Sequence, residues 1–412
     1  PVLEFRAGPK RSHFLKDLGH GMASRVRVRF APSPTGEPHV GNIRTAVFDW
    51  LFARHHGGDF VIRVEDTDQA RTIEGATDAM LEALRWLGLD WDEGPDIGGP
   101  HAPYYQSQRL ERYHHVADML VQDGKAYHCF CSAERLAALR KEQQKQGATT
   151  TGYDGLCRSL SEGQVQGHGG SGETPVVRFR LPGGGTTGVD DLIHGQVEFE
   201  NRLYDDFVML KSDGYPTYHL ASVVDDHEME ISHVTRGIDW LSSIPLHIQL
   251  YQALGWEPPT FVHLPLILAG DRTKLSKRHG ATSVLEYRQM GMLPETMLNF
   301  LALLGWSLDD KTEIFSRHEL IDQFTLEQVN KSDAVWDADK LSWMNGVHIR
   351  DASPQRFAGA LADYWDGHPP DEFPERHDRE FAVKVGPLIQ GRIKTLADAA
   401  PLLPFFFVER VD

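Results

Sequence analysis

The sequence predicts an α/β protein that combines a parallel sheet, an inserted α+β element and a mostly helical C-terminal part. A strand-like alternation over residues 25–30 is followed by a helical stretch over residues 40–55 and by a short apolar run over residues 59–64. Strand, helix and buried strand in close succession are typical of a βαβ unit, and therefore of a parallel sheet. The sheet pattern returns from about Tyr218, and beyond Lys274 the chain is mostly helical.

Periodicity and glycine content also predict the elements of the segments between and after this unit. Amphipathic spacing predicts helices over residues 77–86 and 109–121, and period-two alternation predicts strands of the insertion over residues 176–181 and 196–200. The glycine-rich stretch over residues 163–172 predicts a loop. Where the sheet returns, the predicted elements are two buried apolar strands and then a helix, at residues 223–224, 231–234 and 244–254.

The composition indicates a folded, acidic protein. There are 42 Lys and Arg against 59 Asp and Glu, a formal net charge of −17, and 41% of residues are hydrophobic. This excludes a disordered chain and a polycation that coats nucleic acid by charge alone, but it leaves open a nucleic-acid enzyme with a local basic face. Three cysteines are too few for a disulfide framework, which favours a reducing, cytoplasmic location. No run of 18 apolar residues occurs, so we expect no membrane partner.

The first residues resemble a leader more than a folded element. Residues 1–21 lack the apolar region of a secretory signal, and Met22 stands just before the first strand. We expect Met22 to be the natural start and residues 1–24 to be a leader or extension. A basic targeting extension is the alternative.

Two distant segments carry the residues that suit a triphosphate. His39 falls at a predicted loop-to-helix junction, where we expect unpaired backbone N–H groups that suit a phosphate. Gly41 lacks a Cβ, so a flat ring could lie against the helix there. Lys277, between Lys274 and Arg278, concentrates positive charge that would stabilise a phosphate transition state. Taken singly, His39 is more often a surface or capping histidine, and such a basic loop is more often only solvated.

Together these segments resemble a known family. Residues 39–42 (His-Val-Gly-Asn) and 274–278 (Lys-Leu-Ser-Lys-Arg) resemble the two ATP motifs of class I aminoacyl-tRNA synthetases. The longer segments that surround them resemble bacterial-type glutamyl-tRNA synthetase, over residues 29–42, 63–68, 211–219 and 240–243. The resemblance extends over about residues 25–412, and it stops short of the family's usual C-terminus, which suggests a C-terminal truncation.

The resemblance implies a domain organisation for the whole chain. The expected parts are a Rossmann-type catalytic domain in two halves around an acceptor-end-binding insertion, then a helical stem-contact domain and a partial helical anticodon-binding domain. Their expected boundaries are residues 25–105 and 218–273 for the two halves, 106–217 for the insertion, 274–350 for the stem-contact domain and 351–412 for the anticodon-binding domain.

The resemblance also implies two sets of binding residues. The ATP set, of which His39 and Lys277 are the expected catalytic residues, is Pro38, His39, Gly41, Asn42, Lys274, Ser276, Lys277 and Arg278. The glutamate set is Arg29, Ala31, Ser33, Glu65, Tyr218, Ser222 and Arg236. Glu65 suits the ammonium, and an arginine suits each carboxylate, because guanidinium binds carboxylate in a bidentate manner. Which of Arg29 and Arg236 faces which carboxylate is left open. Without the resemblance, Arg63 and Glu65 would fit a surface ion pair equally well.

Two departures and one acidic motif qualify this assignment. The family often has Asn where this chain has Ser222, and it usually has two acidic residues where this chain has Ile238-Asp239. Residues 225–227 (Asp-Asp-His) have the composition of a metal triad. We expect them to form a loop near ATP instead, because consecutive residues rarely converge on one ion.

The three cysteines form a separate constellation. Cys129 and Cys131 are followed by Cys157, and thiolates are good zinc ligands. Some relatives carry a histidine where this chain has Ser159, and others use a tyrosine that Tyr153 matches. We expect a structural zinc held by Cys129, Cys131, Cys157 and Tyr153. The alternative is a knuckle that holds by packing alone.

The implied function is that of a glutamate–tRNA ligase. ATP with Mg²⁺ and L-glutamate would be the substrates, tRNA(Glu) the partner and a monomer the working form. The alternatives are a short paralogue that modifies a base in a tRNA for aspartate, disfavoured by the long segment after Arg278, and a non-catalytic tRNA-binding protein, disfavoured by the presence of His39 and Lys277. A glutamine-specific relative is disfavoured by the helical C-terminal pattern. Whether tRNA(Gln) is also charged is left open.

Overall fold

A computed structural model describes residues 25–148, 151–170, 172, 174–369 and 379–407. These residues form two compact units. The first contains residues 25–35, 57–73 and 91–263, and the second contains residues 36–56, 74–90 and 264–407. The proposed start at Met22 and the expected leader over residues 1–24 lie outside the described residues.

The first unit is built on a six-stranded sheet with the order β2-β1-β8-β9-β5-β6. Its strands are β1 (Arg27–Phe30), β2 (Asp59–Ile62), β5 (Thr186–Asp191), β6 (Gly195–Glu200), β8 (His233–Gly237) and β9 (Thr260–Leu264). β1 pairs in parallel with both β2 and β8, β5 pairs in parallel with β9, and β6 is antiparallel to β5. All residues of β1 and β2 are buried. The apolar run of β2 fits a central parallel strand, whereas in β1 two arginines alternate with apolar residues and are buried together with carboxylate partners.

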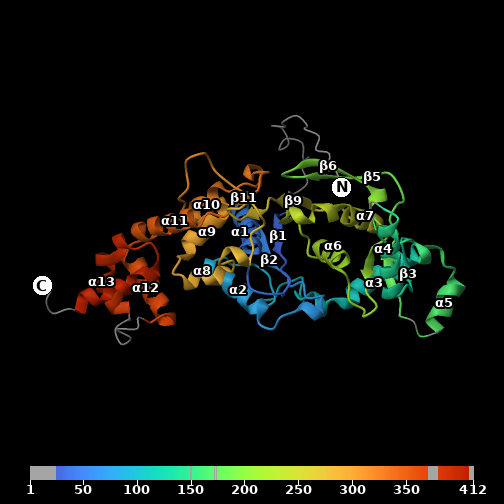
Figure 1. The fold of residues 1–412 in the computed structure, drawn as a ribbon, viewed down its shortest axis with the longest axis horizontal. Helices are drawn as coiled ribbons and strands as arrows, with labels where there is room; N and C mark the ends of the chain where they lie inside the picture. The colour runs from blue at the N-terminus through green and yellow to red at the C-terminus, as the bar shows by residue number, and fades with distance from the viewer. Residues whose placement is uncertain (1–24, 149–150, 171, 173, 370–378, 408–412) are drawn as a thin grey trace. The chain divides into compact units, whose positions relative to one another are not determined.

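A smaller antiparallel sheet belongs to the same unit. It consists of β3 (Ala126–Cys129), β4 (Val176–Phe179) and β7 (Val208–Leu210). The α-helices of the unit are α3 (Leu110–Gln122), α4 (Ala133–Lys145), α5 (Glu162–Gly170), α6 (Tyr218–Glu228) and α7 (Ile244–Leu254) (Figure 1). Helices α3, α6 and α7 share one apolar core with the strands, and that core includes Tyr113, Val224 and Leu250. The short 3-10 helices are Gln69–Arg71, Gln106–Gln108, Leu156–Ser159, Asn201–Leu203 and Ile238–Ser243.

The second unit is mostly helical. Its α-helices are α1 (Val40–His55), α2 (Ala76–Leu87), α8 (Val284–Gln289), α9 (Pro294–Leu303), α10 (Arg317–Gln323), α11 (Ala338–Asp351), α12 (Pro354–Gly367) and α13 (Arg379–Ile389). A two-stranded parallel ribbon joins β10 (Ile267–Leu268) to β11 (Ala334–Val335). The 3-10 helices of this unit within the described residues are Lys277–His279, Leu326–Gln328, Gln390–Arg392 and the longer Leu396–Phe407. Helices α12 and α13 close around a core that contains the fully buried Trp365.

The predicted α/β class is confirmed, and so are the helices at residues 40–55 and 244–254. The loop predicted over residues 163–172 is wrong, because α5 occupies most of it. Ser161 and Gln164 explain the helix. The Ser161 hydroxyl accepts from the Gln164 N–H, and the Gln164 side chain accepts from the Ser161 N–H, which is a capping box that offsets the cost of the glycines.

One strand assignment is also wrong, and so is the sheet to which a second, correctly predicted strand was assigned. Val223 and Val224 lie in α6, where they face the core, so their apolar character reflects a buried helix face. The strand at residues 196–200 belongs to the six-stranded sheet through the β5–β6 hairpin and not to the sheet of the insertion. Alternation cannot tell which sheet a strand joins, since both sheets offer a half-buried surface. Within the part of the chain that the structure describes, no helix is both long and apolar enough to cross a bilayer.

Candidate functional site

Arg63 stands at the centre of a buried network of charges in the first unit. It follows β2 and is completely buried. Its Nη1 donates to Asp226 Oδ1 at 2.7 Å, its Nη2 donates to Glu65 Oε1 at 3.2 Å, and its Nε lies 3.7 Å from Asp225. The alternative of a surface ion pair between Arg63 and Glu65 is therefore wrong. One guanidinium instead links three carboxylates away from water, where charge interactions are strong.

Asp226 connects this centre to Arg29. The Nε of Arg29 donates to Asp226 Oδ1 at 2.9 Å, and its Nη2 donates to Oδ2 at 3.4 Å. Burial alone would raise the pKa of Asp226, but Arg29 and Arg63 lower it overall, so the carboxylate is charged. Arg29 Nη1 donates to the carbonyl of Thr235 on β8. Arg29 is therefore fixed along its Nε–Nη2 edge, and each terminal nitrogen keeps a second N–H for another partner.

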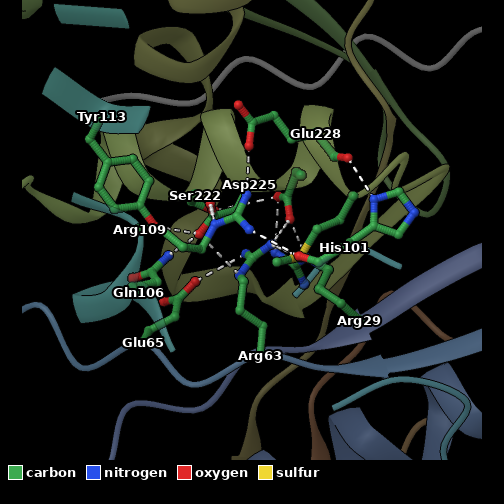
Figure 2. A network of polar contacts seen from close by, with 12 residues as sticks. Arg29, Arg63, Glu65, His101, Gln106, Arg109, Tyr113, Ser222, Asp225 and Glu228 are labelled. Carbon is green, nitrogen blue, oxygen red and sulfur yellow. Dashed lines mark hydrogen bonds and ion pairs between the residues drawn. The ribbon is translucent and has the colours of Figure 1, made fainter. Parts of the chain in front are cut away.

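Asp225 carries the network into α3 (Figure 2). It accepts from Arg109 Nε at 2.7 Å, from Gln106 Nε2 at 2.9 Å and from the Tyr113 hydroxyl at 2.8 Å. Arg109 also pairs with Glu228 at the end of α6. These contacts lie within the first unit and lock α3 against α6.

The loop near ATP that was expected for residues 225–227 is wrong. These residues belong to α6, which buries Asp225 and Asp226. His227 is exposed on another face of the helix and stacks on Trp256 at 3.8 Å. The three side chains do not converge, because consecutive helical residues point about 100° apart. The motif is a structural ion-pair element and not a metal triad.

The other residues of the expected glutamate set surround these charges. Glu65 is largely buried, and burial raises its pKa even though Arg63 and Arg29 lie close. Ser222 lies in α6, where its hydroxyl contacts Asp226 at 3.4 Å. Ala31 and Ser33 follow β1 in a loop that is tied to the β2 side by the bond from Glu65 N–H to the Pro32 carbonyl.

Arg236 differs from the other buried arginines. It lies on β8, and among the residues that the structure describes no carboxylate forms an ion pair with it. Its Nη1 donates to the Tyr218 hydroxyl at 2.8 Å and its Nε donates to His263 at 3.0 Å. Tyr218 begins α6 and packs against Trp240. A buried guanidinium with only neutral partners is costly, so this position suits an anionic ligand.

His39 is the N-cap of α1 in the second unit. Its Nδ1 accepts from the Gly41 N–H at 3.0 Å, and its carbonyl accepts from the N–H of Asn42 and Ile43. The Val40 N–H donates to Thr282. The expectation of unpaired N–H groups is therefore wrong, because the chain itself caps this helix. The cap places the imidazole proton on Nε2, where it can serve as a donor. Pro38, just before the cap, is buried, and its carbonyl accepts from the Val284 N–H.

The basic segment of residues 274–278 is organised by a residue that the sequence did not single out. His279 Nδ1 accepts from the Ser276 N–H at 3.1 Å and contacts the Ser276 hydroxyl. Arg278 is exposed and donates to Thr273 at 3.0 Å. Lys277 begins the 3-10 helix Lys277–His279, and its side chain lies outside the description. His279 follows directly on the basic motif, which was the one signal that could have revealed it.

The cysteines come together as the spacing predicts. The Sγ atoms of Cys129, Cys131 and Cys157 all lie within 4.8 Å of one another. Burial and the two neighbouring thiols raise the pKa of Cys131 to about 12, because adjacent thiolates repel. A divalent cation would remove that repulsion, so the donor set fits zinc. The Tyr153 hydroxyl accepts from the Cys157 N–H at 2.7 Å, which leaves its oxygen a remaining lone pair for a metal.

Comparisons with known proteins agree with this geometry. Residues 25–343 match the family described as tRNA synthetases class I (E and Q), catalytic domain. The chain therefore belongs to that family, and the resemblance drawn from the motifs is confirmed.

Individual relatives are similar over nearly the whole chain. A protein of Dehalococcoides mccartyi named glutamate–tRNA ligase is 54% identical over 95% of this chain and 79% of its own. One of Moorella thermoacetica with the same name is 48% identical over 94% of this chain and 79% of its own. The crystal structure of a glutamate tRNA ligase from Elizabethkingia meningosepticum in complex with its amino acid has a TM-score of 0.84 and 37% identity, covering 94% of this chain and 82% of that one.

Proposed function

We propose that the chain is a glutamate–tRNA ligase that activates glutamate with ATP and transfers it to tRNA(Glu). The observation that carries the proposal is Arg236, a buried guanidinium without a carboxylate partner among the described residues, on the strand next to Arg29. Two arginines and the carboxylate of Glu65 match the two carboxylates and the ammonium of glutamate. The relatives' printed names support the same substrate.

The reaction would need no protein nucleophile. An α-carboxylate oxygen of glutamate attacks the α-phosphorus of ATP, the bond to the β-phosphate oxygen breaks, and glutamyl-adenylate and pyrophosphate form. The 2′-hydroxyl of the terminal adenosine of the tRNA then attacks the activated carbonyl, and AMP leaves. Mg²⁺ bound to ATP would share the phosphate charge. The protein contributes positioning and electrostatic stabilisation.

Each residue of the amino-acid set has a proposed role. Arg29 keeps N–H groups on both terminal nitrogens and would bind the side-chain carboxylate. Arg236 and Tyr218 would bind the α-carboxylate, and Glu65 the ammonium. Glutamine would offer the remaining N–H groups of Arg29 a neutral amide in place of a carboxylate, so in this buried site it should bind less strongly than glutamate.

The ATP segments have proposed roles that follow from their local structure. His39 would donate its Nε2–H to a phosphate, and Lys277 would neutralise charge that develops on the α-phosphate. Gly41 and Asn42, in the first turn of α1, would lie beside the nucleotide, and Ser276, Lys274 and Arg278 would line its phosphates.

For the insertion and the C-terminal part we propose binding of tRNA. The sheet formed by β3, β4 and β7 would contact the acceptor end, with zinc as a structural ion at its cysteines. The helical domains over residues 274–350 and 351–412 would contact the stem and the anticodon. A monomer is the proposed working form.

ATP–pyrophosphate exchange with tRNA(Glu) present tests the function. We expect exchange with glutamate and little with glutamine or aspartate. Exchange that favours glutamine, or none with any of the three, would contradict the proposal. Charging assays with purified tRNA(Glu) and tRNA(Gln) decide whether the second tRNA is also a substrate.

A further inference from the structure

A second line of buried polar contacts leads from the β5–β6 hairpin to Arg236. Asp191, the last residue of β5, lies 2.6 Å from the Nδ1 of His263 on β9, and both side chains are completely buried. The Nε2 of His263 lies 3.0 Å from the Nε of Arg236 on β8. Arg236 in turn donates to Tyr218 at 2.8 Å. Three neighbouring strands of one sheet thus contribute consecutive members of the line.

The partners of His263 determine where its proton lies. The Nε of Arg236 always carries hydrogen, so the Nε2 of His263 must be the acceptor. The ring proton then lies on Nδ1 and is donated to Asp191. Burial lowers the pKa of His263 to about 4, with Asp191 raising it and Arg236 and His194 lowering it, so the ring is neutral at physiological pH.

The backbone fixes the orientation of Asp191. Its Oδ1 accepts from the N–H groups of Ile193 and His194, at 3.1 and 2.9 Å. Its Oδ2 is thereby left to face the imidazole. The backbone of the hairpin turn therefore determines that the Oδ2 atom of the Asp191 carboxylate faces the ring of His263.

We propose that Asp191 and His263 are positioning residues: Asp191 fixes the tautomer of His263, and His263 then holds the Arg236 guanidinium in the orientation that binds the amino-acid carboxylate. The inference rests on the proposed role of Arg236 in glutamate activation. With Nε held by His263 and Nη1 by Tyr218, the guanidinium cannot rotate about its Cδ–Nε bond without breaking both contacts. The same logic governs a catalytic histidine oriented by a buried aspartate.

Asp191→Asn tests the first step. The two backbone N–H groups retain the amide oxygen, so the amide NH₂ must face the Nδ1 of His263. The ring then carries its proton on Nε2 and opposes the N–H of Arg236. The KM for glutamate should rise about tenfold or more, the scale of one hydrogen bond to a charged group, with a smaller change in kcat. Asp190→Asn is the matched control, because it makes the same charge change at the neighbouring exposed position of β5.

The tautomer itself can be read independently of activity. In histidine-labelled protein, the ring ¹⁵N and ¹³C shifts of His263, assigned by their loss in His263→Gln, should indicate Nδ1–H in the wild type and in Asp190→Asn. They should indicate Nε2–H in Asp191→Asn. An unchanged tautomer in Asp191→Asn would overturn the proposal.

Two substitutions at His263 separate positioning from packing. The side-chain oxygen in His263→Gln can reach the place of Nε2 and accept from Arg236, whereas His263→Asn reaches only the place of Nδ1 and can pair with Asp191 alone. The KM for glutamate should be nearer to wild type in His263→Gln, at similar losses of thermal stability. The proposal is overturned if the rise in the KM for glutamate matches the loss of thermal stability in both His263→Gln and His263→Asn. It is also overturned if the tautomer of His263 switches in Asp191→Asn while the KM for glutamate stays at the wild-type value. A wild-type protein that does not activate glutamate would refute the proposed function and leave the tautomer assignment standing.

Discussion

The residues proposed for glutamate and those proposed for ATP differ in how the protein holds them. In the first unit, Arg29 is 4% exposed, and carboxylate and carbonyl oxygens fix its direction. In the second unit, Lys274 and Arg278 are exposed, and Arg278 donates to the neutral side chains of Thr273 and His279. A carboxylate can be told from an amide only by charges of fixed direction away from water, whereas phosphate attracts any nearby cation. The proposed roles of the two sets, selectivity for glutamate and neutralisation of phosphate charge, match this difference.

Arg29 and Arg236, the two arginines proposed to bind glutamate, differ in whether the protein supplies a counter-charge. Arg29 already has Asp226 as a counter-charge, while Arg236 has only neutral partners among the described residues. A ligand carboxylate at Arg29 meets a partly neutralised cation, and one at Arg236 meets a full charge. We therefore expect Arg236 to supply more of the binding energy and Arg29 more of the selectivity.

The largest expected effect comes from removing either arginine. In Arg29→Ala, kcat/KM for glutamate should fall roughly 10²- to 10³-fold, because a buried charge loses its partner, while activation of glutamine should change far less. In Arg236→Ala, both amino acids should be weakened alike, since both carry an α-carboxylate. Pyrophosphate exchange with glutamate and glutamine measures this, with tRNA(Glu) in each assay because the family resemblance implies that activation requires it.

The opposite pattern would reverse the assignment of the two arginines. That pattern is equal loss for both amino acids in Arg29→Ala together with selective loss in Arg236→Ala. Equal loss in both variants would place the selectivity elsewhere, with Tyr218 and Ser222 as the next residues to test.

A smaller effect is expected at the exposed ATP segment. Lys277→Ala should slow adenylate formation by roughly 10²-fold, the scale of one lost transition-state donor. Thermal stability should stay at the wild-type value, because Lys274 and Arg278, on either side of Lys277, are exposed. Near-wild-type pyrophosphate exchange in this variant would remove Lys277 from the mechanism.

His39 allows its two roles to be separated. His39→Asn keeps a good N-cap but loses the Nε2–H donor, so we expect adenylate formation to slow about tenfold, the scale of one lost hydrogen bond to a charged group, without loss of stability. His39→Ala should show the same slowing and also lose about 1 kcal/mol of the free energy of unfolding. Thermal unfolding and pyrophosphate exchange on both variants provide the measurement. If His39→Asn were as active as the wild type, His39 would be a cap alone.

The elements that sequence predicted well are those whose signal is local. The apolar run before Arg63 and the spacing over residues 244–254 gave correct elements because burial dictates them directly. The loop predicted at residues 163–172 is wrong because the glycine content favours a loop, whereas the capping pair of Ser161 and Gln164 stabilises a helix. Val224 was assigned to a strand because a short apolar run cannot by itself distinguish a buried strand from a buried helix face.

Residues of the candidate site could be predicted from the sequence only where they lie within a recognisable sequence motif. Arg29, Glu65 and Arg236 are predicted from sequence, but the pairings of Arg29 with Asp226 and of Arg236 with His263 are not. Asp226 is 197 positions from Arg29, and Asp191 is 72 positions from His263, so no spacing rule links them. Which carboxylate meets which guanidinium depends on sheet order and on the side chains that face the core, and a single sequence contains neither directly.

The smallest effect on activation is expected from the cysteine cluster, which lies at the end of β3 and in the 3-10 helix Leu156–Ser159 and contains none of the residues proposed for glutamate or ATP. Metal analysis should find about one zinc per chain in the wild type, and Cys129→Ser should lose it, because zinc requires its thiolate ligands. Glutamate activation at saturating tRNA(Glu) should stay within about twofold, since no contact links Cys129 to Arg29 or Arg236 among the described residues. The KM for tRNA(Glu) should rise if zinc shapes the surface for the acceptor end.

Ser159→Ala, next to the cluster but not proposed as a ligand, is the control and should keep the metal. A zinc-free wild-type protein of normal stability would favour the packing-only alternative, and a large loss of glutamate activation in Cys129→Ser at saturating tRNA would tie the cluster to the chemistry after all.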